Sequence, residues 1–76
     1  MKRFFFDYTT KDQSLYDYRG DEFPSPRGAF KFAEEIAQDL KHSLTGDWVG
    51  WSIEVRNAEG QKFFSLPVDR AEPLAA

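Results

Sequence analysis

The alternation of side chains near the N-terminus constrains the fold more than any other feature of the chain. Residues 3–8 read Arg-Phe-Phe-Phe-Asp-Tyr. Successive side chains of a strand point to opposite faces, so Phe4, Phe6 and Tyr8 share one face. That face predicts a core strand. The opposite face carries Phe5 between two charged residues, where a solvated face is normally polar throughout, and this surplus aromatic indicates a partner.

Hydrophobic patterns predict three further strands and one helix. Alternation favours strands at residues 15–18, 48–56 and 61–66, and residues 19–22 resemble a turn. Ser25 is a good N-cap and Pro26 suits the first helical position. Gly46 supplies the helix stop. The apolar helix stripe is predicted to comprise Ala29, Phe30, Phe32, Ala33, Ile36, Ala37, Leu40 and Leu44.

The element order strand-strand-helix-strand-strand predicts an α+β fold. We expect a ββαββ arrangement, with a four-stranded antiparallel sheet and one amphipathic helix packed on one face. Residues 1–68 are predicted to form a single domain, followed by a flexible C-terminal tail at 69–76. The predicted strand contribution to the core is Phe4, Phe6, Tyr8, Val49, Trp51, Ile53, Val55, Phe64 and Leu66.

Composition argues against several classes of function. The chain has 76 residues, no cysteine, one histidine and a formal net charge of −3. This composition disfavours a disulfide, a His-rich metal site and a cofactor, and the acidic balance makes nucleic-acid binding unlikely. No signal peptide or membrane span is expected, which predicts a cytoplasmic protein without membrane contact.

Three segments carry recognisable motifs. Residues 3–7 read Arg-aromatic-aromatic-Phe-Asp, residues 17–24 contain a Gly-acidic-apolar-Pro step before an Ala-rich helix, and residues 53–60 form a predicted final hairpin. Together they resemble a family of short uncharacterised proteins, common in alphaproteobacteria, each built around one domain of unknown function. The first loop departs from the family, since residues 9–12 lack the glycine that members often carry. The resemblance implies a compact α+β fold but does not point to any particular activity.

No residue pattern indicates catalysis, and we expect that the protein is not an enzyme. His42 is predicted to be a solvated residue near the C-terminal end of the helix. The acidic cluster of Asp17, Asp21 and Glu22 lacks the spacing of a calcium loop, and turn chemistry explains it.

The strongest functional candidates are side chains that alternation places on the outer sheet face. This candidate interaction surface comprises Arg3, Phe5, Trp48, Arg56 and Phe63. The pattern leaves three interpretations open. The first is an ordinary surface, with Trp48 in a loop, a bulge that shifts the register at Phe63, and Phe5 simply exposed. The others are a protein interface and base stacking on aromatics flanked by arginine.

From these patterns we predict a small non-enzymatic protein-interaction module. Its expected partner is a protein, including a second copy of itself in a homodimer formed through the outer sheet face or a sheet edge. The alternatives are an antitoxin-like regulatory module that binds a small partner protein, and single-stranded nucleic-acid binding through sheet aromatics.

Overall fold

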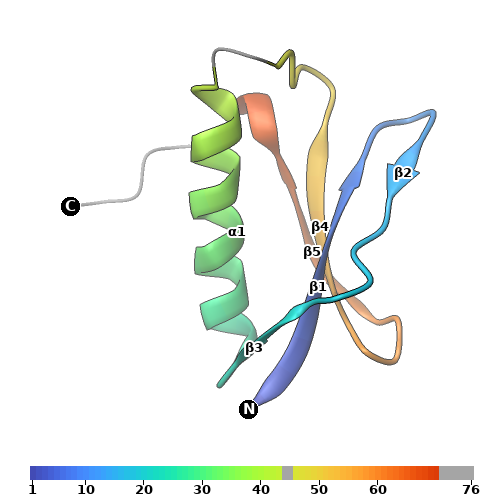
Figure 1. The fold of residues 1–76 in the computed structure, drawn as a ribbon, viewed down its shortest axis with the longest axis vertical. Coiled ribbons are helices and arrows are strands. Elements are labelled where there is room, and N and C mark those ends of the chain that lie inside the picture. The colour runs from blue at the N-terminus through green and yellow to red at the C-terminus, as the bar shows by residue number, and fades with distance from the viewer. Residues whose placement is uncertain (44–45, 71–76) are drawn as a thin grey trace.

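The computed structural model describes residues 1–43 and 46–70 and shows an antiparallel sheet with one helix on one face (Figure 1). The α+β prediction is confirmed, although the sheet has five strands where four were expected. No helix in the described ranges is long and apolar enough to cross a membrane. The elements are β1 (Lys2–Thr9), β2 (Ser14–Leu15), β3 (Asp21–Phe23), α1 (Pro26–Lys41), β4 (Ser52–Asn57), β5 (Lys62–Pro67) and the 3-10 helix η1 (Val68–Arg70).

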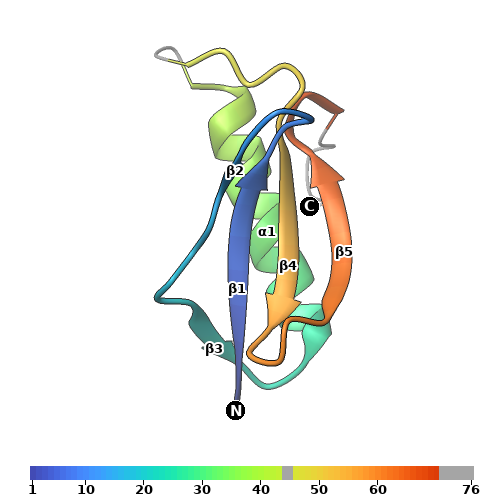
Figure 2. The same ribbon diagram turned by 90° about the vertical axis from the view of Figure 1, so that its right-hand side faces the viewer.

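Strands β1 and β4 form the centre of the sheet (Figure 2). The order is β2-β1-β4-β5, and β3 pairs with the same edge of β1 as β2 does. Because β3 and β4 both run antiparallel to β1, they are parallel to each other with β1 between them. Helix α1 makes the connection between these two strands and therefore crosses over the sheet.

The edge beside β1 is where the structure departs most from the predicted hairpin. The strand expected at residues 15–18 ends at Leu15, and the expected turn at residues 19–22 gives way to β3 from Asp21 onward. Tyr8 pairs with Leu15 and Phe4 pairs with Asp21. Three residues of β1 (5–7) thus face five residues (16–20), so the edge holds two extra residues. We call residues 16–20 the edge loop.

Helix α1 begins as predicted and packs through its smallest side chains. Ser25 has extended backbone angles at the N-cap but makes no side-chain capping bond, and Pro26 opens the helix. Ala29, Ala33 and Ala37 are fully buried, because a methyl group allows the helix to approach the sheet closely. The helix ends at Lys41, and Leu44 of the predicted stripe lies outside the described residues.

The core contains all but one of the predicted strand residues. Phe4, Phe6, Ile53 and Val55 are buried, with Tyr8, Trp51, Phe64 and Leu66 partly buried against them. The placement of Val49 in the core is wrong: its side chain is 72% exposed. The predicted third strand was too long, since β4 begins only at Ser52. A turn precedes it, in which the Trp51 N–H donates to the Trp48 carbonyl at 3.1 Å.

The C-terminal end of the sheet extends further than the sequence indicated. Pro67 pairs with Ser52 at the end of β5, and the Val68 N–H donates to the Trp51 carbonyl at 2.9 Å. Val68 is fully buried and opens η1, which also includes positions 69 and 70 of the predicted tail. The rest of that tail, residues 71–76, lies outside the described residues.

Candidate recognition site

The structure separates the five residues that alternation grouped on the outer face. Phe63 lies on the helix side, with its ring centroid 5.6 Å from that of the buried Phe4. The reason is a bulge: Val55 pairs with Phe64 and Arg56 with Lys62, so Phe63 has no residue opposite it on β4. The prediction that Phe63 faces outward is therefore wrong.

Trp48 is also misplaced by the alternation argument. It precedes β4 in the turn and packs against the core, with ring centroids 5.5 Å from Trp51 and 6.3 Å from Tyr8. The ordinary interpretation, with Trp48 in a loop and a bulge at Phe63, is the one that the structure shows for these two residues.

Arg3, Phe5 and Arg56 do lie on the outer face, but they contact their own neighbours. The guanidinium carbon of Arg56 lies 4.6 Å from the centroid of the half-buried Phe5 ring. Arg3 donates to the Arg19 carbonyl at 2.8 Å and lies 3.8 Å from the Glu22 carboxylate. The outer face is consequently a set of charged contacts around one covered ring rather than an aromatic platform.

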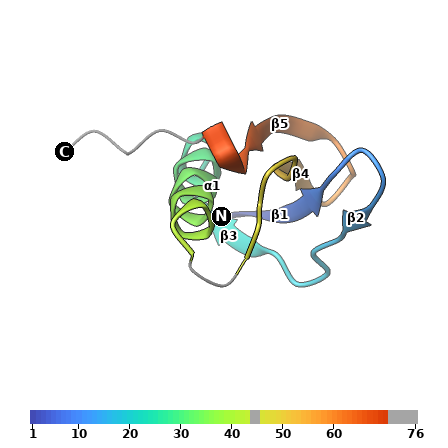
Figure 3. The same cartoon turned by 90° about the horizontal axis from the view of Figure 1, so that it is seen from above.

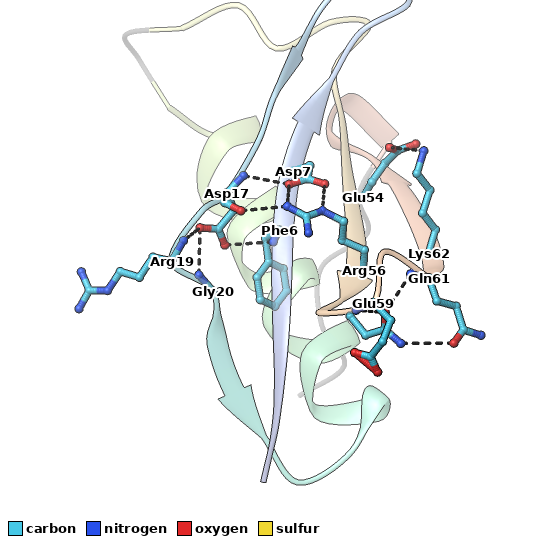
Figure 4. Close-up of polar contacts among 11 residues, drawn as sticks. Phe6, Asp7, Asp17, Arg19, Gly20, Glu54, Arg56, Glu59, Gln61 and Lys62 are labelled. Atoms are coloured by element: carbon cyan, nitrogen blue, oxygen red, sulfur yellow. Dashed lines mark hydrogen bonds and ion pairs between the residues drawn. The ribbon is translucent and has the colours of Figure 1, made fainter.

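A buried carboxylate on this outer face anchors the edge loop. Asp7 accepts hydrogen bonds from Nε and Nη2 of Arg56 at 2.7 and 3.3 Å, and from the Asp17 N–H at 2.9 Å. Arg56 Nη2 also donates to the Asp17 carbonyl at 3.0 Å. Figure 4 shows this guanidinium held between Asp7 and the edge loop. The side chain of Asp7 is only 2% exposed and that of Arg56 21%.

Asp17 fills the gap that the two extra residues leave in the sheet. Its carboxylate accepts hydrogen bonds from the backbone N–H groups of Phe6, Arg19 and Gly20 at 3.1, 2.9 and 3.0 Å. The Phe6 bond replaces one that a neighbouring strand would make. Gly20 completes the loop at φ +71°, where a Cβ atom would lie 2.8 Å from the Phe4 carbonyl oxygen.

The titration behaviour of these groups follows from the same contacts. Burial alone would raise the pKa of Asp17, but the three backbone donors and the charge of Arg56 outweigh it, and the pKa lies below its ordinary value. The hydrogen bond to Asp7 holds the pKa of Arg56 above its ordinary value against the effect of burial. Burial, with the charge of Asp17, raises the pKa of Tyr8. Asp17 and Arg56 are therefore both charged at neutral pH.

The edge loop is fixed by its backbone yet exposes large side chains. Tyr16 is 57% and Tyr18 87% exposed, on either side of the anchored Asp17. A loop whose backbone is already ordered loses less conformational entropy when a partner binds to it. Tyrosine side chains on such a loop are typical of protein recognition surfaces.

An open groove lies beside this loop because the sheet edge curls away from the helix. In Figure 3, β3 runs close to α1 whereas β2 lies away from it. The space between α1 and this edge of the sheet has a volume of about 470 Å³. Its apolar floor is formed by Phe6 and Tyr8 of β1 and by Phe32 and Ile36 of α1. We call it the edge groove.

The far wall of the edge groove is part apolar and part acidic. Leu15 and Tyr16 contribute exposed apolar surface, and Asp17 and Asp21 are the acidic residues of this wall. Leu15 shares the helix-side face with its pair partner Tyr8, but the helix does not reach far enough to cover it. The edge groove thus continues the hydrophobic core out to the surface.

The remaining candidates carry no site. His42 is exposed at the helix C-cap, as predicted. Asp17 is committed to backbone donors, and within residues 1–43 and 46–70 no group of three or more His, Cys, Asp or Glu side chains is arranged to hold a metal ion.

Sequence reasoning missed both the edge groove and the buried Asp7. One signal was available: an Asp inside a strand, with an Arg on the same face of another strand, is typical of a paired buried charge. The curl of the edge has no comparable signal, because it depends on a two-residue mismatch between strands whose pairing the sequence leaves undetermined.

Comparison with known proteins identifies the family. A family model described as "Domain of unknown function (DUF6894)" matches residues 3–69. No curated protein and no solved structure matches the chain. The match includes β1 from its second residue, all the other strands and the helix, and confirms that the family is one built around a domain of unknown function. The chain belongs to the DUF6894 family, a domain of unknown function.

Proposed function

We propose that this domain is a non-enzymatic protein-interaction module that recognises a partner protein through the edge loop and the edge groove. The observation that carries the proposal is that hydrogen bonds hold the backbone of the edge loop in place while its Tyr16 and Tyr18 side chains are exposed. Asp7 and Arg56 hold the loop from below, so the loop keeps its shape in the absence of a partner. The adjoining apolar floor supplies surface that a partner can bury.

Binding rather than catalysis is supported by how the titratable groups are used. The carboxylates of Asp7 and Asp17 both accept internal hydrogen bonds, and His42 lies on the exposed helix end. Catalysis by proton transfer needs a titratable group directed at a substrate in a pocket.

Site-specific photo-crosslinking tests the proposal. In one variant a photoreactive p-benzoylphenylalanine replaces Tyr18. In the control variant it replaces Val49, a turn residue whose side chain is 72% exposed. In the cells that produce the protein, position 18 is expected to yield a discrete adduct that Asp17→Ala, which frees the loop, reduces severalfold. Adducts at position 49 alone, or equal adducts at both positions, would refute the assignment.

A second candidate function is self-association along β5. Of the two predicted homodimer arrangements, the edge-to-edge one is supported by the unpaired edge of β5 in the described part of the chain. Within the described part of the chain β5 pairs only with β4. Since the Val68 N–H bonds to β4, alternation directs the main-chain groups of Ser65 to the free edge. Sedimentation velocity at micromolar concentration should then show a dimer that Ser65→Pro dissociates, and a monomer throughout would eliminate it.

A further inference from the structure

The edge groove carries charge of one sign on both of its sides. On the loop side Asp17 and Asp21 line it. On the helix side the floor of the edge groove ends at Phe32. With a rotation of 100° per residue about the helix axis, Asp39 lies about 20° and Glu35 about 60° from Phe32, on the side away from the core.

Two contacts show which side of helix α1 carries Asp39 and Glu35. Phe32 contacts Phe6, with ring centroids 5.2 Å apart, and a Cβ atom at Gly28 would lie 3.5 Å from Phe23 of β3. Gly28 lies about 40° beyond Phe32 on the same side as Asp39 and Glu35. These two exposed carboxylates therefore border the edge groove rather than the β5 side of the helix.

No basic side chain among the described residues lines the edge groove. Arg19 belongs to the edge loop but does not line the groove, and Lys31 lies about 100° beyond Phe32 around the helix, farther from the groove than Asp39 and Glu35. The groove is thus apolar along its floor and acidic along both rims. The complementary surface is an apolar stripe flanked by lysine or arginine.

The sheet edge determines whether the partner segment that fits the edge groove is a strand or a helix. An extended strand cannot add to this edge along its length, because β2 has two residues, β3 has three, and the edge loop interrupts the ladder between them. Helix α1, with 16 residues, is about 24 Å long, and its Phe32 and Ile36 side chains line the edge groove. A second helix laid beside α1 can pack its apolar side chains over this floor.

We infer that the edge groove binds a basic amphipathic helix of a partner protein. The inference rests on the proposed recognition role of the groove and assigns the chemistry of its partner. The apolar floor supplies burial, and the four carboxylates select a cationic helix and set its orientation. A second copy of this chain fits poorly, because its own helix presents Glu35 and Asp39 to the same acidic rims.

Fluorescence anisotropy with designed peptides tests the inference. The probes are three labelled 18-residue peptides: an amphipathic Leu/Lys helix, its Leu/Glu counterpart, and a Leu/Lys peptide of the same composition with the amphipathic order scrambled. The Leu/Lys helix is expected to bind at least tenfold more tightly than either of the others. Its affinity should fall as salt rises from 50 to 300 mM, because salt screens exposed charges.

Matched charge reversals locate the binding. Glu35→Lys and Asp21→Lys change exposed rim residues, whereas Glu59→Lys makes the same change in the exposed hairpin turn between β4 and β5. Each rim variant is expected to weaken binding about threefold to tenfold, with the Glu59→Lys affinity unchanged. Circular dichroism confirms that each variant is folded.

Two outcomes overturn the inference. One is equal binding of the Leu/Lys and Leu/Glu helices, and the other is an equal effect of the three reversals on the affinity for the Leu/Lys helix. If either occurs while position 18 still crosslinks a partner, the assignment of a basic helix fails and the recognition role stands. If crosslinking at position 18 also fails, both are refuted.

Discussion

Removal of the Asp7 carboxylate is the sharpest test of how the edge loop is held. Asp7→Ala deletes the acceptor of two hydrogen bonds from Arg56 and of one from the Asp17 N–H. The guanidinium of Arg56 then keeps its bond to the Asp17 carbonyl but loses its counter-charge. The variant therefore weakens the loop anchor and leaves a half-buried cation without a carboxylate partner.

The structure sets the size of the effect. Breaking a fully buried ion pair by removing one partner costs about 3–5 kcal/mol. Because the Arg56 side chain is 21% exposed and can reach water, we expect about 2–3 kcal/mol for Asp7→Ala. A domain of this size has a free energy of unfolding of roughly 4–11 kcal/mol, so the loss is a large part of the total. The melting temperature should fall by about 8–24 °C.

Urea denaturation followed by tryptophan fluorescence measures this loss, since Trp48 and Trp51 both pack against the core. The matched control is Glu54→Ala, which breaks a pair on the same outer face. Its carboxylate lies 3.3 Å from the Lys62 ammonium, whose side chain is 64% exposed, and such a pair contributes about 0–1 kcal/mol. Equal losses of unfolding free energy for the two variants would refute the view that Asp7 is a buried anchor.

Three further predictions concern the loop and the bulge. Gly20→Ala and Gly60→Ala both strain a positive φ, at about 1–2 kcal/mol each, but only Gly20 meets a neighbour, so Gly20→Ala should lower the urea midpoint clearly more than Gly60→Ala. Because the pKa of Asp17 is lower in the folded than in the unfolded protein, its contribution to stability is complete above the ordinary value of 3.8 and is lost as pH falls below it. Unfolding titrations from pH 7 to pH 3 should therefore show a flatter acid limb for Asp17→Asn, and an identical limb would contradict the hydrogen-bond assignment. Phe63→Ala should cost about 2 kcal/mol in thermal unfolding, because its ring is 39% exposed and packs on Phe4, whereas a change within about 0.5 kcal/mol would indicate a surface position.

The parts of the fold that depend on local periodicity could be predicted from sequence. Residues 2–8 place Phe4, Phe6 and Tyr8 at every second position, and β1 extends over them as expected. The helix carries Ser25 and Pro26 at its start and a continuous apolar stripe, and it begins at the predicted residue. These signals come from neighbouring residues, so they do not depend on how the strands pair.

The candidate site could not be predicted, because strand pairing determines it. The bulge at Phe63 reverses the face of one aromatic, and alternation within β5 has no means of indicating it. The turn before β4 similarly removes Trp48 and Val49 from the strand that their pattern indicated. At the β1 edge, the two extra residues of the edge loop create a groove that no contiguous segment encodes.

Mapping the bound surface by nuclear magnetic resonance tests the central claim most directly. The ¹⁵N-labelled protein is titrated with the unlabelled Leu/Lys amphipathic helix, and backbone amide shifts are followed to saturation. We predict that the largest shifts cluster at Tyr16, Ile36 and their neighbours along the edge groove, with β5 unaffected. Largest shifts along β5, or small shifts spread evenly over the domain, would contradict the assignment of the edge groove as the recognition site.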